Sequence, residues 1–270
     1  MAKKKAKKPA MPKGIEPYET VVPWDPQFKF EQCITFSAKS FRDWLKPILL
    51  DHVKFPKAGK ATPIGDNMSL RSNVLPLWTY TARGGYFFGE PMMGMHWERV
   101  GLDIVSGARK GVIRFDKPIA IPMLTLDEGE RFDNRPWTTV MSATPMEILT
   151  QRPGIRKAKG KVLIAGFGFG LFARQVAAKK SVKQVTVVEL SQSVIDTFAK
   201  NLPDNMKVVQ GDAFEHAGEH DEYDRYLFDT WNSYGRAEYD KQWIAIKDLR
   251  GWENCWAWGD VKTTPKESRW

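Results

Sequence analysis

Three glycines at alternate positions, Gly166, Gly168 and Gly170, end an apolar run that begins at Lys161. A helix-compatible stretch, 171–179, follows at once. This pattern is typical of a buried parallel strand that turns tightly into a helix. A ligand can approach the backbone there because no Cβ blocks it and the helix presents its positive end. We therefore expect a ligand cradle at this turn; a plain turn without a ligand is the alternative.

Acidic residues stand at the ends of the next three strand candidates, at Glu189, Asp212 and Asp229. Open parallel sheets bind ligands beyond the carboxyl ends of their strands. A carboxylate at the second strand end can accept hydrogen bonds from two ribose hydroxyls. Asp212 can accept from an adenine amino group, and Asp229 would then lie over the reacting end of the ligand. Each acid has a structural alternative: Glu189 as a surface residue, and Asp212 and Asp229 as caps of the segments that follow.

The spacing of the glycines indicates which nucleoside ligand is favoured. A dinucleotide fingerprint would need a third glycine at position 171, where Leu171 stands. A ligand with one nucleoside and no pyrophosphate is therefore favoured. S-adenosylmethionine fits that description.

The elements that must position these residues alternate between strand and helix from residue 141 onward. The strand candidates after the glycine strand are 184–190, 206–212, 223–231 and 252–258, and helix candidates separate them. We predict an α/β fold with a doubly wound, mostly parallel sheet. The predicted domains are a disordered basic arm at 1–14, a mixed, mostly β accessory domain at 15–140, and a cofactor-binding domain at 141–270.

Composition limits the partners and the compartment. The net charge is +9, but the first 14 residues hold six lysines and no acid, so the remainder is close to neutral. Such an arm can contact a polyanion weakly, or serve only as a solubilising tail. No apolar run is long enough to cross a membrane. The two cysteines are too few for a disulfide framework, which favours the cytoplasm.

The motifs VLIAGFGFG, TVVELSQSVIDTFAKNLP, VVQGDAF and EYDRYLFDT occur in this order within 141–231. This span resembles the class I S-adenosylmethionine-dependent methyltransferases, and within them the spermidine synthase-like branch. The resemblance implies that the three glycines border the methionine part of the cofactor, that Glu189 holds the ribose, and that Asp212 holds the adenine. It implies that Asp229 is the catalytic aspartate, which faces the attacking amine and deprotonates or orients it. The predicted cofactor-binding residues are Gly166, Phe167, Gly168, Gly170, Glu189, Leu190, Asp212 and Ala213.

Several positions depart from the families that the chain resembles. Ile164 stands where many methyltransferases have an acid, and Phe169 stands where spermidine synthases have an aspartate that binds the aminopropyl ammonium. The usual final hairpin of the sheet also has no sequence. Its absence would leave 252–258 as an apolar edge, so we expect the N-terminal domain or a second copy of the chain to cover it.

These observations favour an S-adenosylmethionine-dependent methyltransferase that acts on a small amine-like acceptor. Aminopropyl transfer is the first alternative, although Phe169 argues against it. A catalytically inactive binding or structural protein of the same fold is the second, and nucleic-acid methylation the third. The pattern His216-x-x-Glu219-His220 resembles a zinc motif, but Gly218 interrupts the helix that it needs, so we expect no metal site.

Overall fold

The structure is a computed structural model that describes residues 18–21, 32–75, 78–82, 85–88, 110–115, 117, 119–127, 137–144, 147, 151–231 and 236–260. Contacts divide the chain into two compact units. The first comprises 1–46, 74–120 and 267–270, and the second comprises 47–73 and 121–266. The domain boundary expected at residue 140 stays a prediction, and the basic arm at 1–14 lies outside the described residues.

The first unit contains the β-rich sheet that was expected in the N-terminal half. Its strand order is β1-β2-β7-β5-β6, with neighbours antiparallel except for the β2–β7 pair. The strands are β1 (Tyr18–Val21), β2 (Gln32–Phe36), β5 (Trp78–Ala82), β6 (Gly85–Phe88) and β7 (Lys110–Phe115). Helix α1 (Ala38–Leu45) begins where the Ser37 hydroxyl accepts a hydrogen bond from the Ser40 amide, and a π-helical turn, Lys46–Leu50, follows it.

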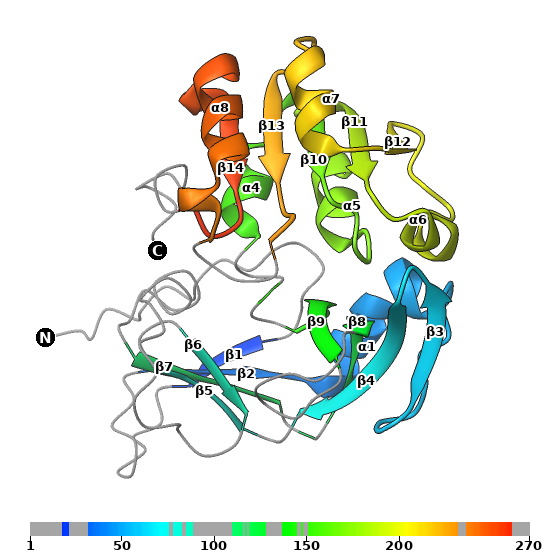
Figure 1. The fold of residues 1–270 in the computed structure, drawn as a ribbon. Coiled ribbons are helices and arrows are strands. Elements are labelled where there is room, and N and C mark those ends of the chain that lie inside the picture. Colours follow the sequence, from blue (N-terminus) through cyan, green and yellow to red (C-terminus); the bar gives the residue numbers. More distant parts are fainter. Residues whose placement is uncertain are drawn as a thin grey trace, which may run out of the picture. The chain divides into compact units, whose positions relative to one another are not determined.

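The second unit contains the predicted parallel sheet (Figure 1). The strand order is β12-β11-β10-β13-β14, and every neighbouring pair is parallel. In chain order the strands are β10 (Gly160–Ala165), β11 (Val182–Glu189), β12 (Met206–Gln210), β13 (Arg225–Phe228) and β14 (Cys255–Ala257). The chain starts at the centre, winds outward to β12, and then crosses to the other side. This order creates a switch point between β10 and β13, where such sheets bind ligands.

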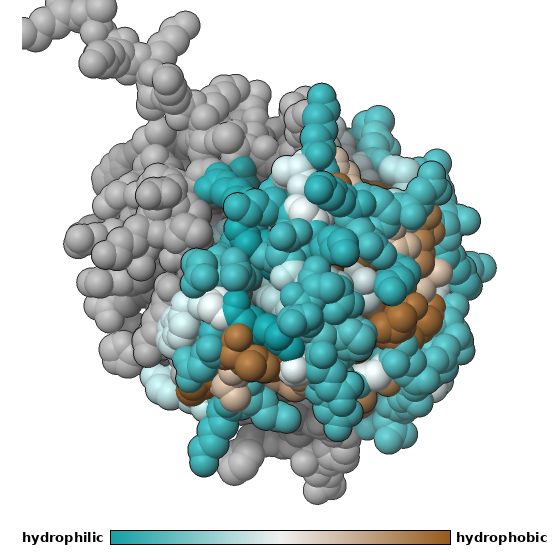
Figure 2. All heavy atoms as spheres, turned by 90° about the horizontal axis from the view of Figure 1, so that it is seen from above, coloured by the Kyte–Doolittle hydropathy of each residue, from teal (hydrophilic) through white to brown (hydrophobic). Residues whose placement is uncertain are grey.

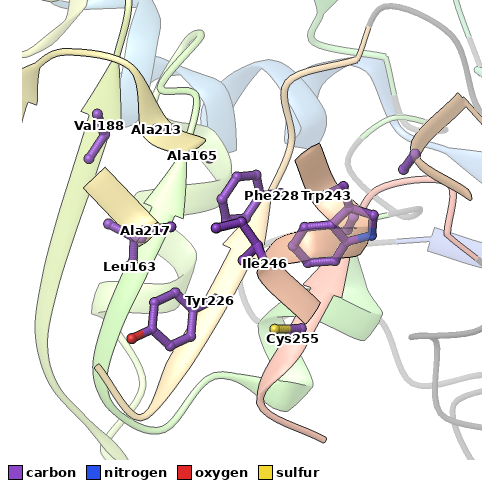
Figure 3. Packing of buried hydrophobic residues seen from close by; sticks show 12 residues of the cluster. Leu163, Ala165, Val188, Ala213, Ala217, Tyr226, Phe228, Trp243, Ile246 and Cys255 are labelled. Carbon is purple, nitrogen blue, oxygen red and sulfur yellow. The ribbon is translucent and has the colours of Figure 1, made fainter. Parts of the chain in front are cut away.

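Helices cover both faces of this sheet, as its buried β-branched strands require. They are α4 (Arg152–Lys157), α5 (Leu171–Ala177), α6 (Gln192–Phe198), α7 (Ala213–Glu219) and α8 (Lys241–Arg250), with short 3-10 turns at Arg236–Tyr239 and Trp252–Asn254. On one face, Phe228 and Trp243 pack with their ring centroids 4.8 Å apart in the core that α7 and α8 cover (Figure 3). On the other, Trp256 contacts Phe172 of α5.

A smaller sheet, with order β3-β4-β8-β9, lies in the same unit except for the last two residues of β4 and the first two of β8. Its strands are β3 (Ala61–Gly65), β4 (Met68–Leu75), β8 (Ile119–Asp127) and β9 (Trp137–Ser142). It contacts the parallel sheet's loops in two places. The Met141 sulfur accepts a hydrogen bond from the Phe169 amide at 3.1 Å, and Asp66 accepts one from the Ser191 hydroxyl at 2.7 Å. The small sheet therefore lies against the loops at the carboxyl edge of the parallel sheet.

Strand β14 is the last strand that the described part of the sheet contains, so the expected edge position is observed. The side chains of Cys255, Trp256 and Ala257 are buried within their own unit, and Trp252 is exposed. Association of two copies through 252–258 stays a prediction. The face seen in Figure 2 is mostly hydrophilic, with small separate apolar patches. None of the helices in the described segments is long and apolar enough to cross a membrane.

Candidate functional site

A cavity of about 860 Å³ lies at the carboxyl ends of the parallel strands, within the second unit. The glycine turn, the loops after β11, β12 and β13, and the residue after β14 contribute to its wall. The β3–β4 turn and β9 complete it. Thr139, Val140, Met141 and Glu147 line the cavity on this side. A volume of this size suits a drug-sized ligand.

The glycine turn needs its glycines for two reasons. Gly166, Gly168 and Gly170 have φ values of 84°, 51° and 72°, in the region that disfavours other residues. A Cβ at Gly166 would lie 2.6 Å from the Asp229 carbonyl oxygen, and one at Gly168 would collide with Met141. Gly166 and Gly168 line the cavity. Gly170 is buried behind the turn, where Phe167 packs against it, so neither of these two predicted residues lines the cavity.

Glu189 ends β11 and connects the strand to the glycine turn. Its Oε2 accepts a hydrogen bond from the Phe167 amide at 2.8 Å, and its Oε1 accepts one from the Ser191 amide at 2.9 Å. These bonds fix the carboxylate at the cavity wall. Each oxygen keeps a second lone pair, which a ligand hydroxyl can use.

The predicted adenine residues lie beside it. Asp212 caps α7, because its Oδ1 accepts from the Phe214 amide at 2.7 Å and from the Glu215 amide at 3.3 Å. The capping alternative is therefore what the structure contains, and the Oδ2 of the same carboxylate remains for a ligand. Ala213 and Leu190 line the cavity too. Leu190 is 73% exposed and offers an apolar surface for a planar ring.

Asp229 follows β13 and lies next to the glycine turn. Its backbone amide donates to the Ala165 carbonyl oxygen at 3.0 Å, which continues the β10–β13 pairing. Its Oδ2 accepts a hydrogen bond of 2.7 Å from the side-chain amide of buried Gln151. Burial raises the pKa of Asp229 to about 6, and the hydrogen bond from Gln151 opposes that rise. The group therefore titrates near neutral pH, as a proton acceptor for an amine would.

A second acidic residue, Glu147, lines the same cavity, and no catalytic or binding role was predicted for it. Its Oε2 accepts from the Ser142 amide at 2.8 Å and from the Ser142 hydroxyl at 2.5 Å. Burial raises the pKa of Glu147 to about 8, the negative charge of Asp229 adds to the rise, and the two bonds from Ser142 oppose it. Glu147 belongs to no sequence motif, so its burial beside Asp229 is identified only by the fold.

The pKa of Glu147 predicts a pH-dependent stability. The unfolded carboxyl loses its proton near 4.5 and the folded one near 8, so the free energy of unfolding should fall between about pH 5 and pH 9. We expect the fall to reach about 5 kcal/mol and Glu147→Gln to remove most of it. Chemical unfolding at several pH values measures this effect. Exposed Glu219→Gln is the control, and an unchanged slope in Glu147→Gln would contradict the assignment.

The described charged side chains that line the cavity are all acidic. Among the described residues that line it there is no lysine, arginine or histidine, but there are six acids: Asp66, Glu147, Glu189, Asp212, Asp229 and Asp240. A phosphate or carboxylate ligand would find no cationic side chain there. A ligand with positive charge and hydroxyl groups would find several partners.

The described residues include no cluster of His, Cys, Asp and Glu that could hold a metal ion. Within the zinc-like pattern, the rings of His216 and His220 stack with centroids 4.1 Å apart. The Nε2 of His216 lies 3.0 Å from the Tyr223 hydroxyl. His216 is therefore engaged with a neighbouring side chain.

Comparison with known proteins gives one family. Residues 145–245 match the model of the spermine/spermidine synthase domain. No curated protein matches the chain. Similar solved structures include spermidine synthase from Thermotoga maritima (15% identity, 48% of this chain and 50% of that one, TM-score 0.34) and a putative caffeoyl-CoA O-methyltransferase from Staphylococcus aureus (17%, 40% and 53%, 0.31).

A further similar structure is precorrin 8W decarboxylase from Methanobacterium thermoautotrophicum (21% identity, 41% of this chain and 60% of that one, TM-score 0.32). The chain thus spans about half of each of these proteins. The family match covers β10, β11, β12 and β13 of the parallel sheet, and β14 lies beyond it. Residues 145–245 therefore form a domain that resembles the spermine/spermidine synthase domain, built on the parallel Rossmann-like sheet described above.

Proposed function

We propose that the chain is a transferase that moves a methyl group from S-adenosylmethionine to a small amine. The observation that carries this proposal is the cavity wall, with six acidic side chains and no basic side chain among its described residues. The donor is a sulfonium and the acceptor enters as an ammonium ion. Both are cations, and a wall of this composition favours them over anionic ligands.

The residues present fit an adenosyl sulfonium. Gly166 and Gly168 line the cavity, and a Cβ on either would collide with Asp229 or Met141 and so disturb the turn. Glu189 is fixed with lone pairs left for ribose hydroxyls, and Asp212 and Leu190 offer a polar and an apolar contact to a purine. When bound, the sulfonium would supply the electrophilic carbon.

The protein would then position the acceptor and manage its proton. Asp229 would bind the ammonium group and remove its proton, which frees the lone pair for attack. Glu147 would hold a further proton beside it at neutral pH. The strand ends and the small sheet would exclude water and hold the two reactants in line.

Aminopropyl transfer is the second candidate, and two observations support it. The family match is to the spermine/spermidine synthase domain. S-adenosylmethionine also carries a carboxylate, for which the described wall offers no cationic side chain, whereas decarboxylated S-adenosylmethionine lacks that group. Phe169 argues the other way, because it is buried between Phe55 and Phe198 where spermidine synthases have an aspartate.

A donor titration tests the proposal. Calorimetry with S-adenosylmethionine, its decarboxylated form and S-adenosylhomocysteine should give binding, and Glu189→Ala should weaken it at least about tenfold because it removes charge-assisted hydrogen bonds. Exposed Glu219→Ala is the matched control. Incubation with small amines, followed by mass spectrometry, separates methyl from aminopropyl products. Failure of all three adenosyl ligands to bind would overturn the proposal.

A further inference from the structure

The turn between β3 and β4 lies far from the other cavity residues in sequence but forms part of the wall. Gly65 and Met68 pair across a two-residue loop, Asp66-Asn67, and both loop residues have positive φ, 50° and 55°. This is the geometry of a tight hairpin whose twist matches its strands. Asp66 and Met68 both line the cavity. A rigid turn thus presents one carboxylate to the site.

The turn is held on its two sides. On one side, the Asn67 carbonyl oxygen accepts a hydrogen bond of 2.6 Å from the amide of Asp127, the last residue of β8. On the other side, Gly65 lies against Ser193 so closely that a Cβ would collide with the serine side chain. The position of Asp66 is therefore fixed by the fold.

Asp66 is connected to the predicted ribose site by a chain of hydrogen bonds. Its Oδ2 accepts from the Ser191 hydroxyl at 2.7 Å and from the Ser193 amide at 3.3 Å. The Ser191 hydroxyl in turn accepts from the Val194 amide, and the Ser191 amide donates to Glu189. The hydrogen bond from Ser191 is the main cause that lowers the pKa of Asp66, so this carboxylate is charged at neutral pH.

We propose that Asp66 is a specificity-determining residue of the adenosyl half of the cavity. Through the Ser191 hydrogen bonds it would position Glu189. Asp66 and Glu189 line the same cavity, so the Asp66 carboxylate would also act on the same ribose hydroxyls. A second fixed negative charge there selects a free ribose and rejects one that carries a phosphate. This inference rests on the proposed function, because it assumes an adenosine-containing ligand.

Titrating several ligands against the wild type and two Asp66 variants tests this role. The probes are methylthioadenosine, its 2′,3′-dideoxy analogue, and adenosine 2′-phosphate, titrated against the wild type, Asp66→Ala and Asp66→Asn. We expect Asp66→Ala to lower the affinity for methylthioadenosine about tenfold, which is the effect of losing one charge-assisted hydrogen bond. The affinity for the dideoxy analogue should fall less than about twofold. Asp66→Asn keeps an acceptor oxygen, so it should lose less affinity for methylthioadenosine than Asp66→Ala. Binding of the 2′-phosphate should improve in both variants.

The matched control is Asp204→Ala, an exposed aspartate outside the cavity. Equal weakening of methylthioadenosine and the dideoxy analogue would mean that Asp66 only stabilises the loop, and would overturn the inference while the proposed function stands. Unchanged affinities in both variants would do the same. If the wild type binds no adenosine ligand, the proposed function fails and this inference fails with it. Hydrogen exchange at 191–194 reports in parallel whether Asp66→Ala remains folded.

Discussion

Replacing Asp229 with asparagine should lower the rate of transfer about a thousandfold, within the range for loss of a positioned base, while donor binding changes little. The Asn side chain keeps the size of the aspartate and can still accept the hydrogen bond from Gln151. It cannot take a proton from the acceptor, nor attract an ammonium ion. The loss should therefore appear in kcat and in acceptor KM, with the affinity for the donor preserved.

The pH dependence of kcat/KM in the wild type should also report the ionisation of Asp229. Asp229 must be ionised to accept a proton, and its pKa is about 6, so kcat/KM should rise with pH through that value. Gln151→Leu removes the hydrogen bond that opposes the rise in this pKa. We expect that variant to move the rising part of the profile to higher pH. This shift separates an electrostatic role from a general loss of structure.

Steady-state rates, donor titrations and unfolding midpoints of the variants measure these effects. Asp204→Asn, an exposed aspartate outside the cavity, is the control for a lost surface charge. If Asp229→Asn retains more than a tenth of the wild-type rate, the base must lie elsewhere. Glu147, which lines the same cavity, would then be the group to replace next.

The sequence was a good guide to residues at strand ends. The apolar strands and the helices between them are local patterns, and the parallel order follows from their alternation. Since carboxyl ends of parallel strands meet at one edge, Glu189, Asp212 and Asp229 had to come near one another, and all three line the cavity. The same reasoning located Gly166 and Gly168 in the turn.

Residues that arrive from other segments could not be inferred this way. Asp66 is 125 positions before its partner Ser191, and its approach depends on the pairing of β3, β4 and β8, which no local pattern encodes. Glu147 depends on the same small sheet. The sequence also did not predict in which direction a side chain of the glycine turn points. Phe167 lies between two cavity glycines but packs inward, because its backbone amide, not its ring, faces Glu189.

The glycine turn supplies the second large effect. Gly166→Ala should abolish binding of the adenosyl donor and lower the free energy of unfolding by about 3 kcal/mol, at the upper end of ordinary substitutions. The alanine must adopt a φ of 84° and place its Cβ 2.6 Å from a backbone oxygen at Asp229. Backbone atoms cannot move aside as a flexible side chain can. The turn would therefore shift away from β13 and distort the cavity where donor and acceptor meet.

Gly59→Ala is the matched control, because Gly59 has a φ of 79° and nothing within 4 Å of its missing Cβ. That variant experiences the same backbone strain without the collision, so it should lose only about 1 kcal/mol and bind the donor normally. The difference between the two variants, measured by chemical unfolding and by calorimetry, isolates the close contact between the glycine turn and the residue after β13. Equal losses in both would mean that backbone strain alone explains Gly166, and that the turn has no special relation to Asp229.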